Sequence, residues 1–149
     1  MPVIKRIFWV VVSDGARYWI YSCQRLGGPL KRIAAGASAE SQMLTKDIGT
    51  ERPGRSQGSP KQARHAYANK VDWHDQAEKE LAHEVAIMLN QGYARKSFQR
   101  LLLISPPKTL GEIRKGVRLK GLGDDFMDLD KDLTHLSEHE LKKYLEKIF

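Results

Sequence analysis

The chain has 149 residues, of which 41% are hydrophobic and 29% charged. This composition is typical of an ordinary soluble protein and argues against a disordered or membrane protein. The longest apolar run, residues 7–12, is too short for a bilayer, which takes about 20 residues to cross.

The net charge of +7 is unevenly distributed along the sequence. Residues 124–149 contain eight acidic residues and four lysines, a net charge of −4, so residues 1–123 must carry +11. A basic body favours a polyanionic partner such as RNA, an anionic surface or a phosphate-bearing ligand. The alternative is a soluble protein with a lysine-rich face.

The length predicts one domain, residues 1–149. The first residues pass directly into a strand pattern without a small-residue cleavage site, so we expect no signal peptide. Cys23 is the only cysteine, which excludes an intramolecular disulfide and a multi-cysteine zinc site. We therefore expect a cytoplasmic protein with no membrane partner, no metal and no cofactor.

Three strands are expected in the first third of the chain. Residues 7–13 are apolar at nearly every position, which predicts a central strand buried on both faces. Asp14 and Gly15 both tolerate a positive φ, and they predict a two-residue hairpin turn before a second strand at residues 16–22. A third strand lies either in residues 30–35 or in residues 42–46.

Residues 47–70 are expected to form a long basic loop. Gly and Pro at positions 49, 53, 54, 58 and 60 argue against a helix or a central strand. The basic side chains of the loop outnumber its acids, Asp47 and Glu51. A long loop inside a compact chain is more often functional or disordered than a plain connector.

The rest of the chain alternates predicted helices and strands. A helix runs from about residue 73 to 95, with Asp72 as N-cap and an apolar stripe that includes Leu81 and Val85. A strand covers residues 99–105, a capping box at 109–112 opens a short helix, a strand follows within 125–129, and a second capping box at 137–140 starts the last helix. The fold class is α/β, with one mixed sheet of about five strands and three helices in the order βββαβαβα, which ribonuclease H-like domains share.

Several motifs together resemble the host attachment family of bacterial proteins. They are the hairpin WVVVSDGARYWIY, the loop core Glu51–Arg55, the tripeptide at 64–66, the segment LLLISPPKTLGEIRK, and the KDLT element at 131–134. These pieces span nearly the whole chain in the family's order. Glu51 departs from the family, which usually has Asp at this position.

The family is similar in turn to the middle domain of archaeal and eukaryotic peptide-chain release factors. In that domain a Gly-Gly-Gln loop before the long helix triggers hydrolysis of peptidyl-tRNA. Here the corresponding stretch, residues 53–58, places Gln57 between glycines but lacks the tripeptide itself. The resemblance therefore leaves peptide release in doubt.

The basic loop is the candidate site for RNA, tRNA or the ribosome. Arg52 and Arg55 can clamp phosphate oxygens, and backbone N–H groups can approach closely at Gly54. The candidate ligand-binding residues are Arg52, Pro53, Gly54, Arg55, Lys61, Arg64 and His65. Two alternatives stay open: internal pairing of the arginines with Asp47, Glu51 or Asp14, and a disordered loop.

Catalysis is the second hypothesis for the same region. Gln57 or His65 could position water in a hydrolase that acts on peptidyl-tRNA or another ester or phosphodiester. Asp14 ends the first strand, where a metal-dependent nuclease would hold a carboxylate. The strand at 99–105 supplies no second acid, so Asp14 is more simply explained by its turn.

Overall fold

The computed structural model describes residues 6–38, 41 and 60–149, with side chains described outside residues 60–71. The elements of this part follow in chain order: β1 (Phe8–Ser13), β2 (Arg17–Cys23), β3 (Lys31–Ala37), α2 (Pro60–Ala94), β4 (Arg100–Ser105), α3 (Pro107–Gly116), the 3-10 helix η1 (Lys120–Asp125), β5 (Phe126–Asp130) and α4 (Glu138–Ile148). One mixed sheet of five strands and three main helices confirms the predicted α/β class. The specific likeness to ribonuclease H-like domains stays a prediction.

The sheet has the strand order β3-β2-β1-β4-β5. β1 pairs antiparallel with β2, and β2 pairs antiparallel with β3. β4 is parallel to both β1 and β5. β1 and β4 therefore occupy interior positions, which explains why their sequences FWVVVS and RLLLIS are almost continuously apolar.

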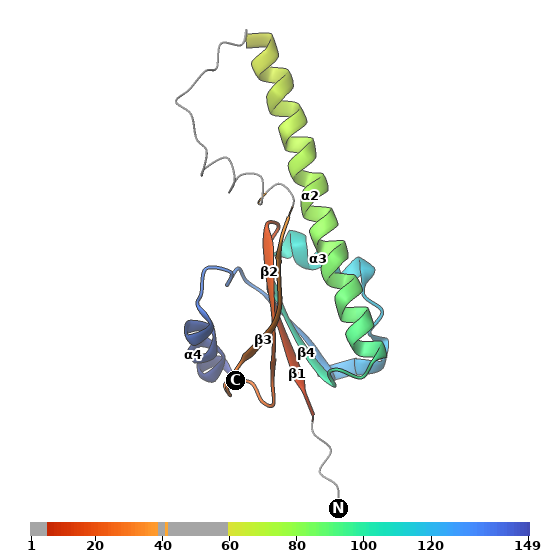
Figure 1. Cartoon of the computed structure of the whole chain (residues 1–149), viewed down its shortest axis with the longest axis vertical. Coiled ribbons are helices and arrows are strands. Elements are labelled where there is room, and N and C mark those ends of the chain that lie inside the picture. Colours follow the sequence, from red (N-terminus) through yellow and green to blue (C-terminus); the bar gives the residue numbers. More distant parts are fainter. Residues whose placement is uncertain (1–5, 39–40, 42–59) are drawn as a thin grey trace, which may run out of the picture.

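Helices cover both faces of the sheet. α2, α3 and η1 lie on one face, and α4 lies on the other (Figure 1). Alternate residues of β1 point to opposite sides, so Val11 joins the core beneath α2 whereas Val10 and Val12 join the core beneath α4. Leu81 and Val85 of the predicted apolar stripe are buried in the first of these cores.

Helix α2 begins earlier than the sequence patterns predict. Its first residue is Pro60, so residues 60–70 of the predicted loop are helical and Asp72 is not an N-cap. Proline is well tolerated at the first position of a helix, where its missing N–H needs no partner. Residues 61–71 contain no Gly or Pro, and several are good helix formers.

The structure decides three further details of the prediction. The third strand is β3 at Lys31–Ala37. The predicted capping box at 109–112 is wrong, because α3 begins at Pro107 and its N-cap Pro106 makes no side-chain bond. The second capping box is confirmed at Ser137 and Glu140, where each side chain bonds the backbone N–H of the other residue.

Candidate functional site

The carboxyl ends of the three parallel strands meet at one edge of the sheet, where α/β proteins commonly place their ligand sites. We call this the carboxyl edge, and it comprises Ser13 of β1, Ser105 of β4, Asp130 of β5 and the residues that directly follow them. Ser13 and Ser105 are fully buried. The Ser105 hydroxyl has no hydrogen-bond partner in the part of the chain that the structure describes.

Asp14 follows Ser13 and organises the hairpin turn through its side chain. Its Oδ1 atom accepts hydrogen bonds from the backbone N–H groups of Ala16 (2.7 Å) and Arg17 (2.8 Å). The backbone N–H of Asp14 donates to the carbonyl of Arg17 at 3.0 Å. Neither Asp14 nor Gly15 has a positive φ, so the predicted turn conformation is wrong. The turn is instead stabilised by the Asp14 carboxylate, which accepts hydrogen bonds from two backbone N–H groups.

The other oxygen of Asp14 joins the turn to a distant segment. Asp14 Oδ2 lies 2.9 Å from Thr134 Oγ1, across 120 residues of sequence. Thr134 Oγ1 is also 2.6 Å from Asp132 Oδ1, which accepts the Thr134 backbone N–H at 3.0 Å. These bonds from Thr134, with smaller contributions from His135 and Arg17, hold the pKa of Asp132 below its usual value. Two motifs that carry the family resemblance, the DGA turn and the KDLT element, therefore meet at the carboxyl edge.

A network of charged side chains from α2 and α3 lies beside this turn. Gly15 packs so closely on Glu78 that an added Cβ would collide with the carboxylate. Lys108 Nζ is 2.9 Å from Glu78 Oε2 and 3.1 Å from Asp75 Oδ1, and these two carboxylates raise the pKa of Lys108. His74 contacts Glu78 at 3.1 Å. The acids are thus paired with bases, and the described residues contain no group of His, Cys, Asp and Glu suited to a metal ion.

The structure locates only part of the predicted site. Asp14 lies at the carboxyl edge, whereas Arg52, Pro53, Gly54, Arg55 and Gln57 lie outside the described residues. Lys61, Arg64 and His65 belong to the first two turns of α2, where only the backbone is described. The roles predicted for these residues stay predictions.

Both ends of the undescribed segment 42–59 can nevertheless be placed. The backbone N–H of Ser38 donates to the Ala16 carbonyl at 2.7 Å, and that of Ser41 donates to Ser38 Oγ at 3.0 Å. The chain therefore leaves the body beside the Asp14 turn. It returns at Pro60, which lies about 27 Å along the axis of α2 from Glu78 at a rise of 1.5 Å per residue.

Sequence reasoning missed the contacts of Thr134, Glu78 and Lys108 with the turn. Thr134 and Lys108 both belong to segments that carried the resemblance, which is the one signal that pointed to them. Glu78 does not belong to the apolar stripe of its helix, yet its side chain is only 19% exposed. Its burial depends on Gly15, whose missing side chain leaves the space that Glu78 occupies.

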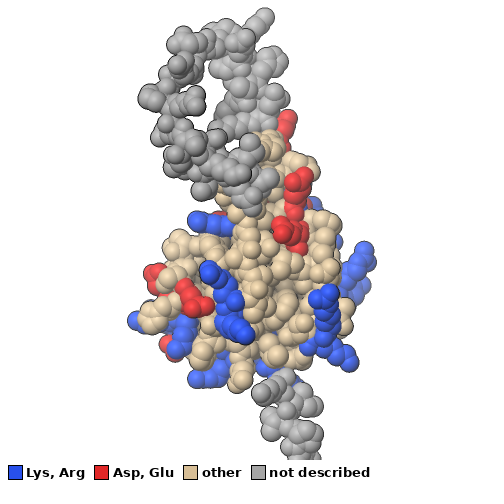
Figure 2. Space-filling model, viewed as in Figure 1, with Lys and Arg blue, Asp and Glu red and all other residues tan. Residues whose placement is uncertain are grey.

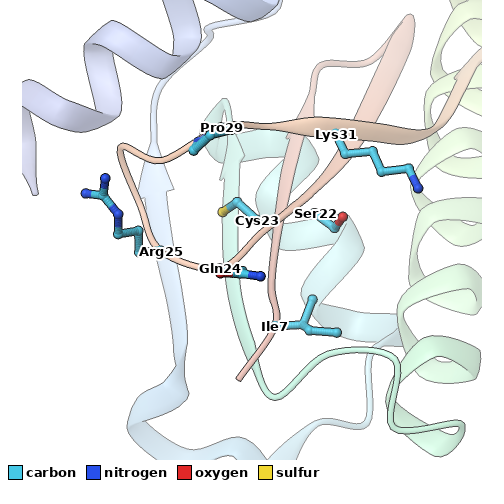
Figure 3. A pocket seen from close by; sticks show the side chains of 7 residues that line it. All are labelled: Ile7, Ser22, Cys23, Gln24, Arg25, Pro29 and Lys31. Atoms are coloured by element: carbon cyan, nitrogen blue, oxygen red, sulfur yellow. The ribbon is translucent and has the colours of Figure 1, made fainter. Parts of the chain in front are cut away.

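One hollow of the described body, of about 530 Å³, lies at the end of the sheet opposite to the carboxyl edge (Figure 3). It is lined by Ile7, Ser22, Cys23, Gln24, Arg25, Pro29 and Lys31. The side chains of Arg25 and Lys31 both point away from the sulfur of Cys23 in this view. Burial raises the pKa of the Cys23 thiol, and only a weaker backbone hydrogen bond at Arg25 acts in the opposite direction.

Cys23 is accordingly expected to be a poor nucleophile. The thiolate is the reactive form, and a raised pKa leaves less of it at pH 8. Reaction with a chromogenic disulfide reagent should be much slower for the native protein than for the protein unfolded in urea at the same pH. Equal rates in the two states would contradict a buried, protonated thiol.

The comparisons with known proteins agree with the resemblance seen in the motifs. Residues 9–145 match the family described as "Protein required for attachment to host cells". The chain belongs to this family. The match extends over nearly all of this host attachment family protein and includes both the DGA turn and the KDLT element.

No curated protein matched the sequence of this host attachment family member. Within the described ranges, no helix combines the length and the apolar character needed to cross a membrane. The similarity to release-factor middle domains stays a prediction from the motifs.

Proposed function

We propose that this host attachment family protein binds cytoplasmic RNA through residues 51–66, which form the basic arm. The arm includes Arg52, Arg55, Lys61, Arg64 and His65, with Glu51 as its one acidic residue. The predicted likeness to release-factor middle domains favours tRNA or ribosomal RNA as the partner.

The observation that carries the proposal is the separation of charge along α2. Residues 60–71 contain Lys61, Arg64 and Lys70 and no acidic residue. Residues 72–84 contain five acids (Asp72, Asp75, Glu78, Glu80 and Glu84) and one lysine. Figure 1 shows that the first half of α2 projects beyond the sheet and the other helices, so the basic part is the part that leaves the body.

This arrangement favours contact with RNA at the projecting end of the helix. Acidic side chains lie along the part of α2 that emerges from the body (Figure 2). Lysines and His74 partly neutralise Asp75 and Glu78, and the remaining negative charge of this part repels phosphates. No acidic residue occupies the first turn of α2, so the positive end of the helix dipole adds to the attraction for anions. A polyanion is thus attracted to the basic arm and repelled from residues 72–84 of α2.

The test is filter binding of tRNA at two salt concentrations, about 50 and 200 mM, the range over which phosphate contacts weaken most visibly. Arg52→Ala combined with Arg55→Ala should weaken binding and reduce the slope of log K against log salt by about 1.4–1.8, since each lost phosphate contact contributes about 0.7 in a single strand and about 0.9 in a duplex.

The matched control removes the same charge from the opposite face of the sheet. Lys143 and Lys147 are exposed on α4, and their joint replacement by alanine should leave the salt slope nearly unchanged. No affinity for tRNA at the lower salt concentration would overturn the proposal. Equal slopes for the arm variant and the control variant would do the same.

A further inference from the structure

A second basic surface lies on the connection between α3 and η1. Residues 114–120 contain four cations, Arg114, Lys115, Arg118 and Lys120, and no acid. Two hollows adjoin this connection and share Val117 and Lys120 in their lining. One, of about 400 Å³, is lined by Val117, Arg118, Lys120 and Gly121. The other, of about 270 Å³, is lined by Arg114, Val117, Leu119, Lys120, Gly123 and Phe126.

The backbone of this connection is held by Asn90 of α2. Asn90 Nδ2 donates to the Gly116 carbonyl at 2.9 Å, and Asn90 Oδ1 accepts the Arg118 backbone N–H at 2.8 Å. One side chain thus fixes both sides of Val117. The connection is preorganised, so a ligand would bind without the entropic cost of ordering the backbone.

Buried leucines alternate with exposed cations in this stretch. Leu119 is 5% exposed and Leu122 is 8% exposed, and both belong to the core beneath α2. Arg118 and Lys120 flank Leu119 and are exposed. Because Leu119 is anchored in the core, the two neighbouring cations are held at the surface beside the larger hollow.

The four cations differ in whether a carboxylate already neutralises them. Arg114 pairs with Asp128 at 2.9 Å, and Lys115 pairs with Glu112 at 3.1 Å. Arg118 and Lys120 form no ion pair with any carboxylate of the described ranges. The larger hollow is therefore lined by Arg118 and Lys120, the two cations of this surface that no described carboxylate neutralises.

Two glycines expose the backbone in the lining of these hollows. Gly121 packs against Tyr93 so closely that an added Cβ would collide with the Tyr93 hydroxyl. Gly123 has a φ of +53° and open space where a side chain would lie. Close approach to backbone N–H groups beside cationic side chains is the combination that holds phosphate oxygens in many proteins.

We propose that this surface, the α3–η1 hollow, binds a phosphate group between Arg118 and Lys120. Arg118 can donate two parallel N–H bonds to phosphate oxygens, and Lys120 adds a mobile point charge. The phosphate can belong to a small phosphorylated molecule or to a phosphodiester chain. Asn90 is a positioning residue, since it acts through the backbone of the connection.

Asn90, which holds the connection, lies about 45 Å along α2 from Pro60 at a rise of 1.5 Å per residue. One phosphate therefore cannot contact both the α3–η1 hollow and the first turn of α2. The α3–η1 hollow can therefore bind phosphate whether or not the arm binds RNA. Loss of one activity need not remove the other.

The experiment follows the backbone amide signals of Gly116, Gly121 and Gly123 by two-dimensional NMR of the full-length protein. Pyrophosphate is titrated in one series and a short single-stranded RNA in another. We expect saturable shifts of these signals in the wild type and in the Lys143→Ala/Lys147→Ala control. In Arg118→Ala/Lys120→Ala, affinity should fall at least about tenfold, since charge-assisted hydrogen bonds contribute on the order of 1.5 kcal/mol or more.

The two series identify the source of the phosphate. Shifts with pyrophosphate show that an isolated phosphate group suffices, and shifts with RNA alone show that a phosphodiester chain is needed; both support the proposal. Absence of saturable shifts in both series would overturn it, as would unchanged affinity in the Arg118→Ala/Lys120→Ala variant. Repeating the titrations with Arg52→Ala/Arg55→Ala separates this result from the arm, because pyrophosphate should still shift the three glycines.

Discussion

Replacing Asp14 by alanine is expected to lower the free energy of unfolding by about 3 kcal/mol, because hydrogen bonds to charged groups contribute about 1.5–3 kcal/mol each before solvent exposure reduces them. The substitution leaves the N–H groups of Ala16 and Arg17 without their acceptor. It also removes the contact that joins the hairpin to Thr134. Urea unfolding monitored by circular dichroism measures the change.

Asparagine at the same position is the matched control. Its expected effect depends on which carboxylate receives the single hydroxyl hydrogen of Thr134. The Thr134 hydroxyl has one hydrogen but lies 2.9 Å from Asp14 Oδ2 and 2.6 Å from Asp132 Oδ1. The shorter distance assigns the hydrogen to Asp132, so the side-chain amide introduced by Asp14→Asn could donate to the free lone pair of Thr134. Asparagine also keeps the Oδ1 acceptor for the two backbone amides.

Asp14→Asn should therefore lower the free energy of unfolding clearly less than alanine, by about 1 kcal/mol, since every hydrogen bond of the turn is retained but its acceptor becomes neutral. Equal losses in the alanine and asparagine variants would contradict this account of the turn. They would show that the negative charge itself, and not only the positions of the acceptor atoms, stabilises the turn.

The sequence predicts most of the strands because their signals are local. β1 and β4 are nearly continuous apolar runs, and such runs indicate strands buried on both faces. The cap of α4 lies within four residues of sequence, so Ser137 and Glu140 are recognisable without any tertiary information. β3 has the sequence KRIAAGA, whose small and exposed residues show neither pattern, which explains why its position was left open.

The missed features have two causes, an ambiguous local signal and a contact between distant residues. A proline can follow the end of one element or occupy the first position of a helix, and the glycines near Pro60 favoured the first interpretation. The contact between Asp14 and Thr134 spans 120 residues, so no periodicity or spacing could indicate it. The motifs that carry the resemblance did mark both residues, but they gave no indication that the two side chains meet.

Gly92→Ala is expected to lower the free energy of unfolding by about 2 kcal/mol, the usual range for overpacking a filled core. Gly92 lies near the end of α2, where an alanine would ordinarily stabilise a helix by about 1 kcal/mol. Here the added Cβ would lie 2.5 Å from Trp9 Cη2 and 3.1 Å from Phe98 Cε1. Phe98 is 1% exposed and has no room to withdraw. The half-buried Trp9 ring, whose centroid is 4.6 Å from that of Phe98, can move only by giving up part of this packing.

Gly111→Ala is the control, because it makes the same substitution in a helix where the added Cβ meets nothing within 4 Å. The variant should raise the free energy of unfolding by up to about 1 kcal/mol, through helix propensity and a less flexible unfolded chain. Opposite signs for the two variants in urea unfolding would show that close packing against Trp9 requires glycine at position 92. A gain in both variants would contradict it, since the Trp9 ring would then have moved aside at little cost and helix propensity alone would determine the outcome.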